Sequence, residues 1–186
     1  MDFNPSEERL IIAGCKKNES WAMKRLYEHF APTMMVVCVR YANDLDKAKD
    51  VLHEGFIRVF NKIGSYAAKG SFEGWMRRVF VSTAIELLRK DYFRQHLDIV
   101  DYKESIENFE ISIVEKLSAE DILKYVSELP EGCRTVFNLH AIEGYSHAEI
   151  AKILKIEEGS SRSQFAYARR LLQNKIKKIY YIAEKK

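Results

Sequence analysis

The residues best suited to a chemical role lie toward the end of the chain and are strongly basic. Positions 159–186 hold eight Lys and Arg residues against one acidic residue, Glu184. Cationic side chains at this density neutralise phosphates, so the segment has the charge of a nucleic-acid-binding surface. Arg162 can form two hydrogen bonds with a guanine and Gln164 with an adenine, whereas serine hydroxyls at a helix start serve equally well as caps. The candidate DNA contacts of this segment are Ser160, Ser161, Arg162, Ser163, Gln164 and Arg169.

Two helices joined by a short turn are expected to present these residues. Ser146 followed three positions later by Glu149 is a capping box, and the apolar residues behind it predict a helix of about nine residues. A tight turn is expected at 155–157 and a longer helix from Ser160 onward. This spacing is typical of a helix-turn-helix, whose second helix enters the major groove. An ordinary helical hairpin packed in a bundle has the same spacing.

A second basic group mixes with aromatic residues in the first half of the chain. Phe72 and Trp75 stand near several cationic residues, a mixture that stacks on and clamps single-stranded nucleic acid. Helical spacing favours a core position for both aromatic residues, which leaves the cationic side chains facing solvent. The preceding loop, 66–71, has the small residues needed to hold an extruded base. The candidates here are Tyr66, Lys69, Ser71, Arg77, Arg78, Arg89 and Lys90.

Carboxylates form one ridge on a predicted helix of the same half. Asp46, Asp50 and Glu54 recur at steps of four, with His53 beside them. Exposed carboxylates on a single helix have no reason for shifted pKa values, so they do not suggest acid–base catalysis. The ridge is either a solvated helix face or a contact surface for a basic partner.

Signals for an enzyme, a metal site or export are weak. The dinucleotide, phosphate-loop, zinc-protease and hydrolase motifs do not occur in the sequence. Cys133, His140 and His147 are spaced seven residues apart, but Gly144 is expected to break the helix that would align them. Three widely separated cysteines without a CxxC motif favour a reducing compartment. We therefore expect a cytoplasmic, non-enzymatic protein with no catalytic residues, no cofactor, no metal and no membrane insertion.

Apolar periodicity predicts helices and no strands, so the expected fold class is all-α. The strongest helix is opened by Asp44 as its N-cap and closed by Gly64. A shorter helix is expected upstream through Phe30, a separate one beginning at Pro32, and another after the loop. The helices expected in the second half are 119–129, ended by Pro130, and 134–142, ended near Gly144.

The charge changes sign along the chain. Positions 1–94 hold 16 Lys and Arg against 12 Asp and Glu, 95–123 hold 2 against 8, and 124–186 hold 12 against 7. The acidic stretch lacks a sustained helical stripe, which is typical of a linker. We therefore predict two small helical domains, at 1–94 and 119–186, joined by an acidic linker at 95–118.

Seven short segments match a known protein family in their order. They are RYAND at 40–44, AKDVLHEGF at 48–56, FEGWMRRV at 72–79, AIELLRK at 84–90, LPEGCRTVF at 129–137, EGYSHAEIA at 143–151 and GSSRS at 159–163, followed by Ala168 and Arg169. Each segment is a weak signal alone, but their order and spacing together are specific. The sequence resembles the sigma-70 family of bacterial RNA polymerase initiation factors, in its small two-domain extracytoplasmic-function (ECF) group.

The resemblance implies a role for each candidate surface. The first domain would be region 2, which binds core RNA polymerase and opens the promoter −10 element, and the second would be region 4, which reads the −35 element. The loop at 66–71 corresponds to the loop that captures a flipped base, and the start of the last helix falls on the −35 reading surface. The family also implies core polymerase, promoter DNA and an anti-sigma factor as partners. The residues at the polymerase clamp would be Asp50, His53 and Glu54.

The sequence departs from the family pattern at several positions. Lys155 stands where glycine is usual in the turn, and because a non-glycine residue with positive φ is uncommon, the turn is expected to be either strained or reshaped. Gln164 and Tyr167 replace residues that are usually basic, which weakens phosphate contacts and changes the expected −35 preference. The remaining departures are His53 for Gln, Lys49 for Glu and Ser82 for Asn.

Two other functions fit the same residues. One is a helix-turn-helix regulator that binds operator DNA alone, with the first domain as a sensor or dimerisation module. The other is a degenerate sigma-like protein that binds an anti-sigma factor without starting transcription. Sequence-specific DNA affinity without polymerase identifies the first, and failure to start transcription identifies the second.

Overall fold

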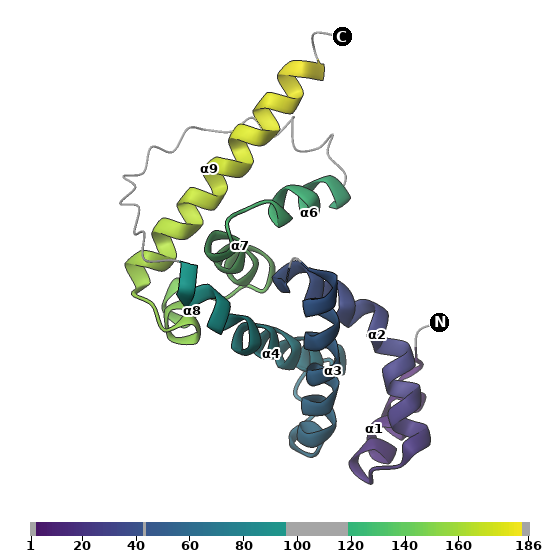
Figure 1. Ribbon diagram of the computed structural model, residues 1–186. Helices are drawn as coiled ribbons and strands as arrows, with labels where there is room; N and C mark the ends of the chain where they lie inside the picture. The colour runs from purple at the N-terminus through teal and green to yellow at the C-terminus, as the bar shows by residue number, and fades with distance from the viewer. Residues whose placement is uncertain (1–2, 43, 96–118, 184–186) are drawn as a thin grey trace. The chain divides into compact units, whose positions relative to one another are not determined.

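The computed structural model describes residues 3–42, 44–95 and 119–183. Every regular element in these ranges is helical, which confirms the predicted all-α class (Figure 1). Among these described helices, none combines the length and the apolar character that a bilayer crossing requires.

The chain divides into two compact units, Met1–Leu88 and Arg89–Lys186. The predicted linker at 95–118 lies outside the described residues except for Gln95. In the first unit, the second helix packs against both the first and the third. The elements that begin in this unit are α1 (Pro5–Lys16), α2 (Ser20–Ala42), α3 (Leu45–Lys62), the 3-10 turn η1 (Ile63–Ser65) and α4 (Phe72–Gln95).

Side-chain caps begin two helices of the first unit. The Asp44 carboxylate accepts hydrogen bonds from the backbone N–H groups of Asp46 and Lys47, at 3.0 and 2.9 Å. Asn4 caps two N–H groups in the first turn of α1 in the same way. These oxygens satisfy donors that have no partner inside the helix. The predicted Asp44 cap is confirmed, whereas α1 was not predicted.

Aromatic rings fill the core of the first unit. Phe30 meets Phe72 edge to face with ring centroids 5.8 Å apart, and Phe56 meets Phe80 in the same way at 5.2 Å. Gly55 on α3 lies directly against the Phe80 ring, and a Cβ at this position would come within 2.2 Å of a ring carbon. Glycine therefore permits the close approach that seats α4, the helix of the cationic candidates, on α3.

The predicted helix break at Pro32 is wrong, because α2 runs without interruption from Ser20 to Ala42. Proline lacks the N–H that would bond four residues back, which weakens a helix at this point. The buried residues before and after it nevertheless continue one apolar stripe, with Leu26 and Phe30 followed by Met34 and Val37. Packing of this stripe against α1 and α3 outweighs the lost hydrogen bond.

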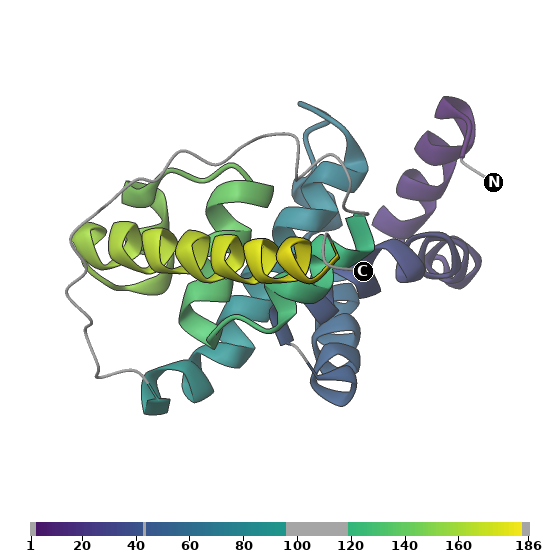
Figure 2. The ribbon, with the colours of Figure 1, turned by 90° about the horizontal axis from the view of Figure 1, so that it is seen from above.

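The second unit is also helical, and its last helix is a single unbroken rod in both views (Figures 1 and 2). Its small apolar cluster brings together α6, α7 and α9 around Val126, Leu129, Cys133 and Ala168. The elements are α6 (Ala119–Ser127), α7 (Glu131–Phe137), the π-helical turn η2 (Asn138–Ile142), α8 (His147–Leu154) and α9 (Glu158–Ala183).

Hydrogen bonds between residues a few positions apart shape the first part of this unit. The buried Arg134 guanidinium donates to the carbonyl oxygens of Ser127 and Leu129, at 3.3 and 3.1 Å, and so satisfies acceptors at the end of α6. Gly144 adopts a φ of 79° after the π-helical turn, and the N–H of the next residue bonds back to Leu139 at 2.9 Å. The predicted helix at 134–142 therefore begins earlier, at Glu131, and ends in a π turn.

Candidate nucleic-acid interface

The predicted helix-turn-helix is present as α8 and α9. Ser146 and Glu149 form the predicted capping box, with the Ser146 N–H donating to the Glu149 carboxylate at 2.8 Å. Lys155 ends α8 in the left-handed region, with φ 57° and ψ 47°. Of the two expected outcomes the turn is therefore strained rather than reshaped, since this conformation costs a side-chain-bearing residue roughly 1–2 kcal/mol. The second helix begins at Glu158, two residues earlier than predicted.

The first turns of α9 carry most of the predicted DNA contacts, and these residues differ in exposure. The Arg162 side chain is 65% exposed and pairs with Glu158, whose Oε1 lies 3.2 Å from Arg162 Nε. The Ser163 hydroxyl donates to the carbonyl oxygen of Gly159 at 2.9 Å. Further along, Arg169 is exposed, and the Arg170 guanidinium lies 5.1 Å from the Tyr167 ring. Ser160 and Gln164 are half-buried.

Ser161 is not one of the exposed residues. Its side chain is fully buried, and its Oγ lies 2.9 Å from Nδ1 of His147 on α8. The prediction of Ser161 as a DNA contact is therefore wrong. Residues on one turn of a helix point in different directions, so a run of neighbouring polar residues cannot all face the same groove.

Two histidines stack in the hairpin behind α9. The rings of His140 and His147 are nearly parallel, with centroids 4.2 Å apart, and Phe165 meets both edge-on. The pKa of His147 is lowered because burial and the nearby His140 and Arg162 disfavour its charged form. Burial also raises the pKa of the Cys133 thiol to about 11, which disfavours the thiolate that a metal would bind. In the described ranges, His, Cys, Asp and Glu form no group of three suited to a metal ion.

The loop at 66–71 is organised by its own side chains. The Tyr66 hydroxyl donates to the carbonyl oxygen of Gly70 at 2.7 Å, and the Tyr66 ring lies 5.1 Å from Phe72 and 5.5 Å from Trp75. The Ser71 hydroxyl accepts from a backbone N–H in the first turn of α4, at 3.1 Å, and so acts as a helix cap. The pKa of Tyr66 is raised by burial and, to a lesser extent, by Glu8.

The cationic candidates of α4 differ in exposure. Phe72 is buried, as its spacing predicted, whereas Trp75 is only half-buried. Arg78 and the loop residue Lys69 are exposed, and Arg77 is half-buried. Arg89 and Lys90 lie on α4 by its backbone, but their side chains fall outside the described residues.

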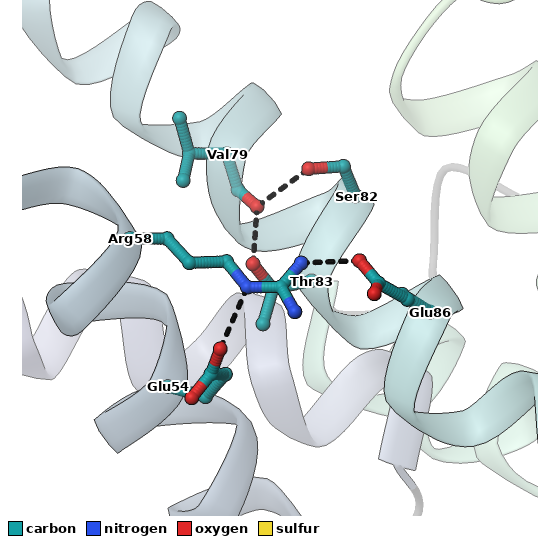
Figure 3. Close-up of polar contacts among 6 residues, drawn as sticks. All are labelled: Glu54, Arg58, Val79, Ser82, Thr83 and Glu86. Carbon is teal, nitrogen blue, oxygen red and sulfur yellow. Dashed lines mark hydrogen bonds and ion pairs between the residues drawn. The ribbon is translucent and has the colours of Figure 1, made fainter. Parts of the chain in front are cut away.

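The predicted acidic ridge divides into exposed and paired residues. Asp50 and His53 are exposed on α3. Glu54 instead accepts a hydrogen bond from Arg58 at 2.8 Å, and the same guanidinium pairs with Glu86 on α4 (Figure 3). Both carboxylates raise the pKa of Arg58, Glu86 having the larger effect. Glu54 thus also helps to hold α3 against α4.

Helix α1, which was not predicted, also contacts the loop at 66–71. Lys16 Nζ lies 3.4 Å from the carbonyl oxygen of Tyr66, although 50 residues separate them in the sequence.

On α4, the hydroxyls of Ser82 and Thr83 both donate to the Val79 carbonyl oxygen, at 2.9 and 2.8 Å (Figure 3). The spacing of Glu54 and Arg58 is a signal that sequence analysis could have used, but the Lys16 contact has no local signature.

Comparison with known proteins identifies the family. Residues 26–94 match the family model for Sigma-70 region 2, and residues 119–172 match the model for Sigma-70, region 4. The chain belongs to the sigma-70 family. The region 2 match takes in the acidic ridge, the loop and α4, and the region 4 match contains the helix-turn-helix.

Relatives of this sigma factor match along nearly its whole length. The ECF RNA polymerase sigma-E factor of Haemophilus influenzae is 24% identical over 180 residues, which cover 91% of this chain and 95% of that protein. The protein of the same name from Escherichia coli K12 is 27% identical over 181 residues, with 91% and 94% covered. This chain is an ECF-type sigma factor, a protein of transcription initiation.

Solved structures of sigma factors also match. A co-crystal structure of the sigma factor RpoE with the anti-sigma factor NepR from Bartonella quintana aligns with a TM-score of 0.49 and 18% identity, covering 83% of this chain and 96% of that one. A structure of CnrH with the cytosolic domain of CnrY aligns with a TM-score of 0.47 and 16% identity, covering 91% and 96%.

Proposed function

We propose that this sigma factor binds core RNA polymerase and opens the −10 element through its first unit, and reads the −35 element with its second. The proposed domains are region 2 at 1–94, an acidic linker at 95–118 and region 4 at 119–186. RNA synthesis is the chemistry of the polymerase, so this chain acts without an active site of its own. The observation that carries the proposal is the helix-turn-helix of α8 and α9, whose second helix begins at Glu158 and exposes Arg162 one turn later.

The proposed −35 surface is the exposed face at the start of α9. Arg162 is its central residue, because its fork of donors matches the two acceptors on the major-groove edge of guanine. Arg162 now forms an exposed ion pair with Glu158, of the kind that contributes little to stability. Replacing this ion pair by hydrogen bonds to a base therefore costs little free energy. The set is Ser160, Arg162, Ser163, Gln164 and Arg169.

The proposed −10 surface combines the loop at 66–71 with the cationic side of α4. The hydroxyl of Tyr66 spans the loop to Gly70, while its ring rests against Phe72 and Trp75. This leaves small residues between two anchored ends, where a base taken out of the stack can enter. The set is Tyr66, Lys69, Ser71, Arg77, Arg78, Arg89 and Lys90.

The proposed polymerase contact is the acidic ridge of α3. Asp50 and His53 are exposed and available to a partner, and Glu54 adds a carboxylate whose position is set by Arg58. Opposite charges on two proteins chiefly increase the rate and specificity of association. An anti-sigma factor is the second protein partner that we propose, on the basis of the family.

The first experiment mixes the full chain with sigma-free bacterial core RNA polymerase and follows complex formation by size-exclusion chromatography at moderate salt. A stoichiometric complex is expected. Asp50→Arg should weaken it, whereas Glu28→Arg, an equal charge reversal on the exposed face of α2, should leave it intact. Absence of any complex with the folded chain would contradict the proposal.

The same preparation separates the two other functions. Sequence-specific DNA binding without polymerase would favour an autonomous regulator. Complex formation with an anti-sigma factor but no transcription from any promoter would favour a titrating protein. Promoter-directed transcription that survives deletion of residues 119–186 unaltered would contradict the assignment of −35 reading to the second unit.

A further inference from the structure

A polar seam joins the two helices of the helix-turn-helix, and we call its four members, His140, His147, Ser161 and Phe165, the histidine seam. Nδ1 of His147 and Oγ of Ser161 are 2.9 Å apart and connect α8 to the first turn of α9. The His147 ring stacks on His140, whose Nδ1 donates to the carbonyl oxygen of Tyr145 at 2.8 Å. Phe165 closes the seam by meeting both rings edge-on.

The seam lies directly behind the proposed reading residues. Ser161 is fully buried and the next residue, Arg162, is exposed, because successive residues of a helix point about 100° apart around its axis. Any rotation or loosening of this turn that releases Ser161 also displaces the Arg162 guanidinium. Contacts to base edges tolerate little displacement. The buried hydrogen bond between Ser161 and His147 therefore controls the position of the exposed Arg162 side chain.

The groups around His147 oppose a positive charge on its ring. His140 faces it from the π-helical turn, and Arg162 and Glu158 face it from α9. Burial, His140 and Arg162 all disfavour the charged form, and the Glu158 carboxylate offsets them only in part. In the neutral ring Nδ1 can accept a hydrogen bond from the Ser161 hydroxyl. In the charged ring Nδ1 carries a proton and can only donate, so the Ser161 hydroxyl must rotate and can no longer donate to it.

We propose that His147 is a positioning residue for the reading helix: in its neutral form it holds the first turn of α9 through Ser161, and its protonation against His140 loosens that turn and weakens duplex binding. The inference deepens the proposed function and rests on it for the DNA step only. The positioning of the turn stands independently of what the helix binds.

The sign of the expected pH effect separates this role from simple electrostatics. The folded-state pKa of His147 is below the value for an unfolded histidine, about 6.5, so the folded state binds fewer protons than the unfolded state as the pH falls past that value. Stability of the turn is therefore full above about pH 6.5 and decreases below it. An added cation near phosphates, by contrast, strengthens DNA binding on acidification.

The first measurement is amide hydrogen exchange in the full chain at several pH values between about 5.5 and 7.5, corrected for the intrinsic rate, around the histidine pKa. Amides in the first turns of α9 should exchange severalfold faster at the acidic end, because the charged His147 ring no longer accepts a hydrogen bond from the Ser161 hydroxyl. His147→Gln, which keeps hydrogen-bonding groups but does not titrate, should abolish this pH dependence. Ser161→Ala should give fast exchange at both ends.

The matched control is His29→Gln in the first unit. His29 also stacks on an aromatic ring, with its centroid 3.8 Å from that of Phe3, but it belongs to the other compact unit. This variant should keep the wild-type exchange profile of α9. Unchanged exchange of the α9 amides across the pH range in the wild-type protein, or an unaltered pH dependence in His147→Gln, would overturn the proposal.

The second measurement is binding of the full chain to sheared genomic duplex DNA over the same pH range. Wild-type binding should weaken on acidification, and His147→Gln should remove that decrease. Binding that strengthens on acidification would overturn the link from the seam to DNA. No binding of the free chain at any pH, together with pH-dependent exchange, would overturn the DNA step of this inference while leaving the positioning of the turn established, and complex formation with core polymerase tests the proposed function separately.

Discussion

The two units of this sigma factor hold their candidate surfaces in different ways. The first unit rests on a dense set of buried apolar side chains, including Phe56, Phe72 and Phe80, with charged pairs at its edge. The second has a small apolar cluster, and buried polar groups complete it: Arg134 at the end of α6 and Ser161 against His147. Hydrophobic burial is non-directional, whereas hydrogen bonds require specific geometry. The second unit should therefore be the more sensitive to loss of a single polar atom.

Gly55→Ala should produce the largest effect in the first unit. Its Cβ would come within 2.2 Å of the Phe80 ring, which is fully buried and has no room to move. Overpacking of this kind costs about 1–3 kcal/mol and occasionally more. Chemical denaturation should report the loss of stability, and Gly64→Ala, where nothing lies within 4 Å of the added Cβ, is the control. Equal stability of both variants would contradict a tightly packed α3–α4 contact.

Arg134→Met should produce the corresponding loss in the second unit. The replacement keeps most of the side-chain volume but removes the donors to the carbonyl oxygens of Ser127 and Leu129. Leaving buried acceptors without a partner costs about 1–3 kcal/mol. Thermal unfolding followed by circular dichroism should show the decrease. A variant as stable as wild type would mean that apolar packing alone holds this unit together.

Arg162→Ala should leave both units folded and change DNA recognition. If Arg162 reads a base, promoter discrimination should fall by about 1–3 kcal/mol. Competition between promoter and random duplex, measured with the reconstituted holoenzyme, gives this difference. Equal losses on both duplexes would make Arg162 a phosphate contact instead, and Lys152→Ala on the exposed side of α8 is the matched cationic control.

Removing one helix N-cap from each unit allows the two units to be compared directly. Asp44→Ala and Ser146→Ala each remove a side-chain oxygen from the start of a helix, at a typical cost of about 1 kcal/mol. The Ser146 variant should also reduce DNA binding, because α8 supports the reading helix, whereas the Asp44 variant should not. Equal DNA affinities for the two variants would contradict the proposal that the second unit depends on local polar contacts to hold its reading helix.

Lys155→Gly should have the smallest effect, and in the stabilising direction. Glycine occupies the left-handed region without the steric cost that Lys155 bears, although it also loses more chain entropy on folding. The net gain should be within about 1 kcal/mol. Thermal unfolding of this variant is compared with that of Lys152→Gly, which places a glycine inside the last turn of α8 and should be destabilising. A loss of stability in Lys155→Gly would show that the lysine side chain itself contributes to the turn.

The sequence by itself determined the features that depend on neighbours a few residues away. These include the all-α class, the caps at Asp44 and Ser146 and the helix-turn-helix of α8 and α9. Helix periodicity, capping and turn conformation are properties of short segments, so composition and spacing are enough to predict them. The order of the family segments added the sigma-70 assignment, which the two region matches bear out.

Only the tertiary structure decided the features that join distant parts of a unit. Packing on both sides keeps α2 continuous through Pro32, Arg58 connects α3 to Glu86, and Ser161 is buried against His147 rather than exposed to solvent. Each depends on which face of a helix meets its neighbour, and a pattern of residue types leaves that open among adjacent polar positions. Burial and tertiary hydrogen bonds select one of these arrangements, because leaving a buried polar group without a partner costs about 1–3 kcal/mol, whereas ordinary residues differ in helix propensity by only up to about 0.7 kcal/mol.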